Sequence, residues 1–415
     1  LNIDCLDCST SSPEIVTMIA ASAHADGLND TTWSTDLDLY NPGAADVTAN
    51  LTFLPPDTDN TNAQAFPATI PAGQTRTFSD VVGDFLGSQD SGAILITANE
   101  PLMASSRTFN TSDEGTFGQF IPGMTLDHAL SPGTESRLNG LAGNSSFRTN
   151  IGFANGSGSS ATLSVDLVAT DGAVIGHFDQ TLEPWGWLQL NRVFRTAGTG
   201  PVEAASAVIR NLSDEAEVFV YASVVDSQTG DPTFVTETLT GDSGSDLWVA
   251  ASAHANGVGQ SVWRTDLWLS NPSGEPVTAT LGLLEKSKDN SGPQTSEHVI
   301  PAGMNVLLSD ALATAFNYTG TAAMRIEVDG ESTVTSRTFN QTDSGTYGQF
   351  IGALGASRAI GADRPGRIVQ LSHFGGTDSG YRTNLGLVNC TDDEISVTVD
   401  MFTADGGALG SRRVG

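Results

Sequence analysis

Few residues of this chain combine types and spacing that could support catalysis. The run Gly241-Asp242-Ser243-Gly244 offers a serine nucleophile, and His24 offers a base. A nucleophilic serine needs a histidine that a buried carboxylate orients on a rigid scaffold. The run instead lies in a Gly-, Ser- and Asp-rich linker. We therefore predict that the chain is not an enzyme.

Histidine and cysteine form no metal-binding pattern. His24 recurs as His254 in an Ala- and Ser-rich context, where we expect a lone histidine to stabilise the fold by hydrogen bonding. Cys5 and Cys8 form a single Cys-x-x-Cys pair, which favours a short-range disulfide or a reduced pair over a four-cysteine zinc site. Cys390 has no counterpart in the repeats described below, so pairing with another chain and a free thiol both stay open.

Acidic loops are the remaining candidates for binding an ion. Asp57 and Asp59 lie in one loop, and Asp242 and Asp246 lie in another. Carboxylates suit calcium, but the loop after Asp57 lacks the glycine and the final glutamate of an EF-hand. Bound calcium and solvated acidic loops without an ion both stay open, and no other cofactor is expected.

Asn-x-Ser/Thr sequons are more frequent than the Ser and Thr content of the chain gives by chance. Their asparagines are Asn29, Asn50, Asn110, Asn144, Asn155, Asn211, Asn317, Asn340 and Asn389. Such sequons accept glycans in exported proteins. The excess favours an exported glycoprotein.

An internal repeat organises the whole chain. The string WSTDLDLYN at 33–41 recurs as WRTDLWLSN at 263–271. The string FRTNIGFAN at 147–155 recurs as YRTNLGLVN at 381–389. All four strings read aromatic, Arg or Ser, Thr, Asp or Asn, an aliphatic residue and a closing Asn. The expected framework residues are Trp33, Asp36, Arg107, Arg148, Asn150, Trp263, Asp266, Arg337, Arg382 and Asn384.

The residue types at these positions indicate structural roles. A catalytic carboxylate would not alternate with asparagine, whereas a hydrogen bond to the backbone of a neighbouring loop suits both Asp36 and Asn150. Arg107 and Arg337 lie in a second recurring segment, Ser-Arg-Thr-Phe-Asn. We expect each arginine to pair with a carboxylate of its own module.

The repeat divides the chain into modules of roughly 115 residues in the order A-B-A-B. We name them A1 (15–128), B1 (129–245), A2 (246–358) and B2 (359–415). B2 matches only about the first half of B1, so it is a partial module. Residues 1–14 are expected to be an N-terminal tail or a strand of a preceding module.

Each module is predicted to be an antiparallel β-sandwich. Apolar and polar residues alternate over 33–40 and 47–54, which is the pattern of half-buried strands. Gly, Pro and Asn separate the strands, and no long helical pattern alternates with them, so a parallel α/β sheet is disfavoured. The modules resemble the tandem immunoglobulin-like sandwich repeats of bacterial and archaeal secreted or cell-surface proteins. That resemblance implies an all-β, Ig-like array.

Composition narrows the choice of partners. Lys and Arg number 18 and Asp and Glu 48, so the net charge is −30. Such a surface repels nucleic-acid phosphates and does not dock on anionic lipid through basic patches. No run approaches the roughly 18 to 20 apolar residues of a membrane helix. We expect no nucleic-acid partner and no direct membrane insertion.

The partial module leads to a functional expectation. Half a sandwich exposes unpaired backbone and an apolar face, so 365–415 is expected to continue in a longer chain or to receive strands from another chain, with residues 1–14 as the donor. We expect a non-catalytic extracellular or cell-surface protein, structural or adhesive. It would form a rod-like part of a surface layer, appendage or filament and bind its own copies or neighbouring surface proteins. The alternative is a set of glycan- or protein-binding accessory modules of a larger secreted enzyme, with Trp185, Trp187 and Trp268 as binding aromatics.

Overall fold

The computed structural model describes residues 14–27, 31–112, 115–239, 246–257, 261–373 and 380–415. This part of the chain is all-β, as predicted, because antiparallel strands dominate and each helix has six residues or fewer. None of the described helices is long and apolar enough to cross a bilayer. The candidate residues Cys5, Cys8, Asn29 and Asp242, the 241–244 run and most of the 1–14 tail lie outside the described residues.

A1 contains two antiparallel sheets, in the orders β10-β1-β7-β4-β5 and β2-β3-β8-β9, with β6 paired on β3. Met18, Leu37, Leu51 and Ile94 come from both sheets and are fully buried in one apolar core. The elements are β1 (Ile15–Ala23), β2 (Ala25–Asp26), β3 (Thr32–Tyr40), β4 (Val47–Leu54), β5 (Ala65–Ile70), β6 (Thr75–Phe78), η1 (Val81–Phe85), β7 (Ser91–Ala98), β8 (Met103–Ser112), β9 (Gly115–Pro122), β10 (Met124–Thr125) and η2 (Leu126–His128).

B1 repeats this arrangement with sheets in the orders β14-β13-β16-β11-β19 and β15-β12-β17-β18. Its core includes Ile151, Phe153, Leu167 and Val220, all fully buried. The elements are β11 (Glu135–Gly143), β12 (Phe147–Asn155), β13 (Ala161–Ala169), β14 (Val174–Leu182), β15 (Trp187–Leu190), α1 (Val193–Thr196), β16 (Val202–Asn211), β17 (Val218–Asp226), β18 (Pro232–Thr236) and β19 (Thr238–Leu239).

In A2 the two layers are joined, because β20 (Asp246–Asn256) pairs with β25 as far as His254, with a register shift between Val249 and Ser252, and then pairs with β21 at Ala255 and Asn256. The strand path is β23-β22-β25-β20-β21-β26-β27, with β24 on β21 and β28 on β20. The other elements are β21 (Val262–Ser270), β22 (Val277–Glu285), β23 (Gln294–Ile300), β24 (Asn305–Leu308), α2 (Ala311–Phe316), β25 (Gly320–Val328), β26 (Thr333–Thr342), β27 (Gly345–Gly352), β28 (Leu354–Gly355) and η3 (Ala356–Arg358).

The described part of B2 contains one hairpin, formed by β29 (Val397–Phe402) and β30 (Ala408–Val414). These strands match β13 and β14 of B1. Residues 381–389, the copy of β12, are not in a strand. Leu385 and Leu387 are 50% and 45% exposed, whereas their copies Ile151 and Phe153 are fully buried.

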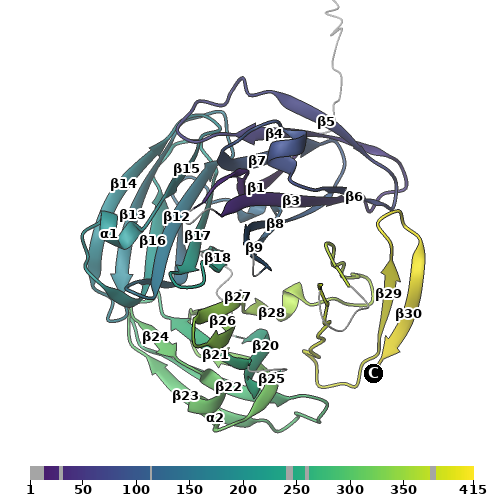
Figure 1. The fold of residues 1–415 in the computed structure, drawn as a ribbon. Helices are drawn as coiled ribbons and strands as arrows, with labels where there is room; N and C mark the ends of the chain where they lie inside the picture. The colour runs from purple at the N-terminus through teal and green to yellow at the C-terminus, as the bar shows by residue number, and fades with distance from the viewer. Residues whose placement is uncertain (1–13, 28–30, 113–114, 240–245, 258–260, 374–379) are drawn as a thin grey trace, which may run out of the picture.

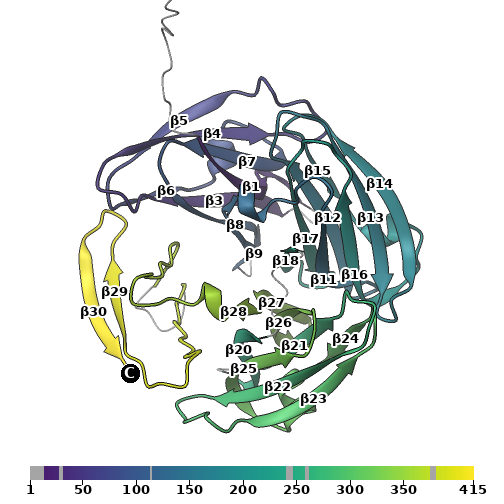
Figure 2. The same cartoon turned by 180° about the vertical axis from the view of Figure 1, so that it is seen from behind.

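The four modules lie in chain order around a ring, with β9, β18 and β27 on its inner side (Figures 1 and 2). The Thr75 N–H of A1 donates to the Ala404 carbonyl of B2 at 2.7 Å. Asn305 is the A2 copy of Thr75, and its N–H donates to the Thr170 carbonyl of B1 at 2.9 Å. The B2–A1 contact thus repeats the B1–A2 contact. The expected rod-like array is wrong for these residues, because B2 returns to A1.

Candidate functional site

The recurring histidines form His–Asp pairs that resemble acid–base dyads in distance. His24 Nδ1 lies 2.6 Å from Asp80 Oδ2, and His254 Nδ1 lies 2.7 Å from Asp310 Oδ2. Asp80 also precedes η1, where its Oδ1 accepts a 3.4 Å bond from the Gly83 N–H. The pair therefore fastens a short helix to the end of β1. We interpret it as part of the fold, not as a reaction centre.

The Asp/Asn position of the repeat stabilises a strained residue before η1, α1 and α2. Asp80, Arg192 and Asp310 have φ of 44°, 54° and 49°, in the left-handed region that costs L-residues energy. Each donates its backbone N–H to the repeat side chain. The acceptors are Asp36 Oδ1 for Asp80 (3.0 Å), Asn150 Oδ1 for Arg192 (3.0 Å) and Asp266 Oδ1 for Asp310 (2.9 Å). An acceptor is all this position supplies, so Asp and Asn serve equally.

The repeat threonine joins the two sheets in A1 and in B1. Thr149 is fully buried, and its Oγ1 accepts the Ala142 N–H at 3.1 Å and donates to the Ala142 carbonyl at 2.7 Å. Thr35 makes the same pair of bonds to Ala23. These bonds satisfy strand ends that leave one sheet for the other, so this residue too is structural. The repeat tryptophans Trp33 and Trp263 pack closely on Gly27 and Gly257.

The closing asparagine accounts for two of the sequons, those of Asn155 and Asn389. Its Oδ1 accepts the N–H of the residue two positions ahead, as in Asn155 with Ser157 (3.1 Å) and Asn389 with Thr391 (3.0 Å). Ser and Thr are common in such turns, so a turn of this kind often spells Asn-x-Ser/Thr. The sequons of these turns therefore need no glycan to account for them.

Three sequon asparagines are excluded as glycan sites in the folded chain. Asn110, Asn155 and Asn211 are at most 5% exposed. Both amide hydrogens of Asn155 are donated to carbonyls, and so are those of Asn211. A glycan needs an accessible amide nitrogen. Glycosylation at Asn50, Asn144, Asn317, Asn340 and Asn389 stays a prediction.

The described calcium candidates, Asp57, Asp59 and Asp246, are not gathered into one site. Asp59 Oδ1 accepts bonds from Thr61, and Asp246 forms two 2.8 Å bonds to Arg325. Asp57 lines a shallow groove of about 160 Å³ between A1 and B1 together with Glu183. Within the described residues, no three His, Cys, Asp or Glu side chains are grouped as metal ligands. Calcium binding stays a prediction, with Asp242 outside the described part.

The framework arginines differ in what they contact. Arg337 donates Nε to Thr233 Oγ1 of B1 at 3.2 Å and Nη2 to Thr346 Oγ1 at 2.8 Å. Arg107 donates to Thr116 Oγ1 at 3.0 Å. The expected ion pair with a carboxylate of the same module is thus replaced by hydroxyls and, for Arg337, by a neighbouring module. Burial lowers the pKa of Arg148, and Arg382 and Asn384 are exposed in B2.

A buried polar junction between B1 and A2 surrounds Arg337. Asp226 Oδ2 accepts the Thr346 N–H and hydroxyl, both at 2.8 Å, and Asp231 Oδ2 accepts the Gly348 N–H at 2.9 Å. Both aspartates are at most 6% exposed. Burial raises the pKa of Asp231 to about 7, although the Gly348 bond and the Arg337 charge oppose the rise. The junction holds the turn between β17 and β18 against β27.

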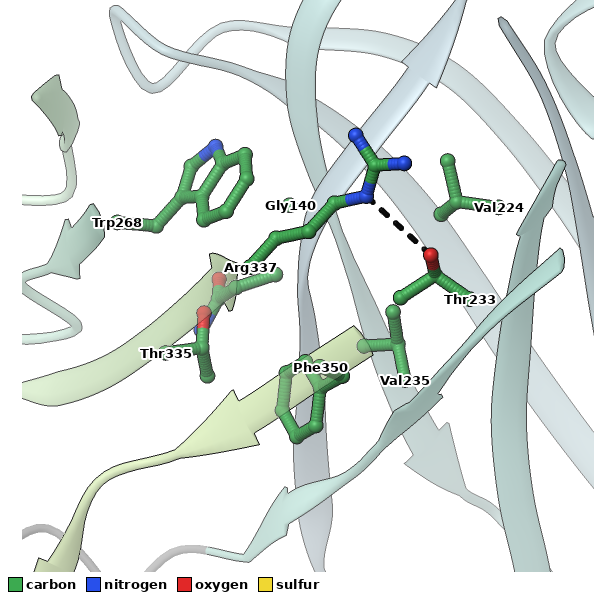
Figure 3. A pocket seen from close by; sticks show the side chains of 9 residues that line it. Gly140, Val224, Thr233, Val235, Trp268, Thr335, Arg337 and Phe350 are labelled. Carbon is green, nitrogen blue, oxygen red and sulfur yellow. Dashed lines mark hydrogen bonds between the residues drawn. The ribbon is translucent and has the colours of Figure 1, made fainter. Parts of the chain in front are cut away.

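Beside this junction lies a cavity of about 10 Å³, lined by Trp268, Thr335, Arg337, Phe350 and residues of B1 (Figure 3). Its volume is close to that of one water-sized probe. The cavity is too small for an organic ligand. It belongs to the packing between modules.

The candidate binding tryptophans are used in contacts between modules. Trp187 is 3% exposed, and its Nε1–H donates to the Ala20 carbonyl of A1 at 2.7 Å. Trp268 packs on Gly140 of B1. Trp185 is partly buried against the core of A1. None of the three stands free as a platform for a sugar ring.

No protein-family model matches the chain, and no curated protein matches it.

The junction residues Asp226, Asp231 and Thr346 were missed by the sequence reasoning. The B2 copies of Asp226 and Asp231 would lie past residue 415, so the repeat could not mark them.

Proposed function

We propose that this chain is a non-catalytic structural protein of the cell exterior that assembles with other polypeptides through the partial module B2. The observation that carries the proposal is the exposure of Leu385 and Leu387, whose copies form the centre of the B1 core. Burying such side chains contributes about 1.5–3 kcal/mol each. Association is the means by which B2 would gain this energy.

Other features support parts of this proposal. The net charge of −30 keeps an assembling protein soluble. The two-sheet arrangement of A1 and B1 is compatible with Ig-like modules, which we propose as the finer fold class. The excess of sequons supports export less than the sequence suggested, because buried turn asparagines account for part of it. The accessory-module alternative is less well supported, because its candidate binding residues Trp187 and Trp268 pack in contacts between modules.

Immunogold electron microscopy of the cells that make the protein tests this proposal. We expect label on the outer surface, in ordered assemblies, on intact cells. Intact and permeabilised cells form the matched comparison. Label that appears only after permeabilisation would overturn the extracellular placement, and isolated surface particles would overturn the structural role.

A further inference from the structure

We infer that the cavity between B1 and A2 binds one ordered water molecule, which joins Asn139 Oδ1 of B1 to Thr335 Oγ1 of A2. The ligand is water because the cavity, at about 10 Å³, has no room for a larger molecule. Such a water makes the B1–A2 contact a hydrated one, in which a bound molecule carries a hydrogen-bonded connection that the two side chains do not make directly.

Three polar atoms of the residues that line this cavity have no hydrogen-bond partner among the described residues. They are Asn139 Oδ1, Trp268 Nε1 and Thr335 Oγ1. Asn139 and Thr335 are each 2% exposed, so bulk solvent does not reach them. A buried polar atom without a partner costs free energy, and a bound water recovers part of that cost. Cavities that stay dry are lined by apolar groups, which is not the case here.

Strand pairing places the A2 members of this set on one face. Trp268 of β21 lies directly opposite Thr335 of β26, so both side chains point to the same side of the sheet. Arg337 lies two positions after Thr335 on the same face, and it donates to Thr233 of B1 at 3.2 Å. The face that carries Trp268 and Thr335 is therefore the face of A2 that meets B1.

Asn139 reaches this face from B1. Its Nδ2–H donates to Thr333 Oγ1 at 2.9 Å, and Thr333 lies two positions before Thr335 on β26, so the two threonines point the same way. One polar atom of the amide thus contacts A2 directly, and the other is left for the cavity. A water there donates one hydrogen to Asn139 Oδ1 and exchanges a second bond with the Thr335 hydroxyl, which can donate or accept.

Apolar side chains close the rest of the cavity. Val224 and Val235 of B1 are at most 6% exposed, and Phe350 of A2 packs against the core of B1. Figure 3 shows Val224 and Val235 across the Arg337 side chain from Trp268. The water has polar partners on one side and an apolar wall on the other, so its exchange with solvent requires the two modules to move apart.

The contact between B2 and A1 has polar residues at the same three positions. The copies of Trp268, Thr335 and Asn139 are Asp38, Ser105 and His373. Asp38 is 7% exposed, and its Oδ1 has no partner among the described residues. Ser105 Oγ donates to Gln370 Oε1 of B2 at 3.5 Å. Polar side chains therefore recur where these modules meet, as hydrated contacts require.

A crystal structure of the full chain, at a resolution that shows ordered waters, tests the inference on the unaltered protein. We expect one peak of water density within about 3.2 Å of both Asn139 Oδ1 and Thr335 Oγ1. A cavity without density, or density for an ion, would overturn the inference.

Oxygen-17 relaxation dispersion gives an independent readout in solution, because it counts the waters that stay in the protein longer than the protein takes to tumble. Thr335→Val keeps the side-chain shape and removes the hydroxyl, so we expect this variant to lose one such water. Thr335→Ser should keep it, and so should Thr295→Val, a matched change at an exposed threonine of β23 in the same module. Circular dichroism verifies that each variant is folded. An unchanged count in folded Thr335→Val would contradict the assigned bond to Thr335, and if this variant does not fold, the crystal structure of the unaltered chain decides.

Discussion

Replacing the closing asparagine of the repeat tests the structural reading most directly, because the chain holds the same residue in a covered and an uncovered module. In B1, Asn155 is fully buried and donates to the Ser159 and Glu183 carbonyls at 2.7 and 2.9 Å. In B2, Asn389 is exposed and donates to the Asp393 carbonyl at 2.7 Å. The perturbation is alanine at each position in turn.

The expected magnitudes differ because burial differs. Asn155→Ala removes two hydrogen bonds in B1, although Ser157 Oγ still donates to the Ser159 carbonyl and the Gly186 N–H to the Glu183 carbonyl. At about 0.5–1.5 kcal/mol for each lost bond, we expect a loss of about 1–3 kcal/mol. Asn389→Ala returns its acceptor to water, so we expect less than about 1 kcal/mol. At about 1.4 kcal/mol per factor of ten, the B1 loss corresponds to exchange roughly 5- to 140-fold faster.

Hydrogen exchange measured by mass spectrometry resolves the two modules separately. Peptides covering 155–165 and 183–190 should accelerate in Asn155→Ala, while the same peptides in Asn389→Ala match the unaltered chain. Equal effects of the two substitutions, or a change of less than threefold in Asn155→Ala, would refute the argument from burial.

Further outcomes follow from the same contacts. Thr149→Val should destabilise B1 by about 2–3 kcal/mol in urea titrations because it removes both bonds to the neighbouring strand, whereas Thr149→Ser should cost under about 1 kcal/mol. The pKa of Asp231 is raised from 3.8 to about 7, so the folded state holds this proton more tightly than the unfolded state. Stability from this group should be full below about pH 4 and decline as the pH rises to about 7. Urea midpoints against pH should show that decline and lose it in Asp231→Asn. Trp187→Phe removes the bond to A1 and should weaken the A1–B1 contact by about 1–2 kcal/mol, seen as faster proteolysis between the modules. Glycopeptide mapping after expression in a glycosylating host should find Asn110 and Asn211 unmodified, and occupancy at either would contradict their burial.

The all-β fold could be predicted from the sequence because local patterns of apolar and polar residues mark the strands. Alternation along 33–40 marks β3, and the repeated string also locates β12 and β21, whereas its fourth copy at 381–389 is not in a strand. The framework positions were also recognisable, since their recurrence separates them from loop residues. The hydrogen-bond partners of these residues could not be predicted from the sequence, as Arg337 shows. Its nearest partners are Thr233, in another module, and Thr346, on the adjacent strand, and no spacing rule links them.

The sequence by itself determined the repeat, most of the strands and the asparagines that close the repeat strings, because the hydrogen bonds of these residues are local and recur in A1, B1 and A2. Tertiary structure alone decided that B2 returns to A1 in a ring and that Asp226 and Asp231 are buried with Arg337. It also decided which sequon asparagines are covered. The physical reason is that contacts between modules depend on the angle at which one sandwich follows the next. Many small packing contacts set that angle, and none of them produces a repeating pattern in the sequence.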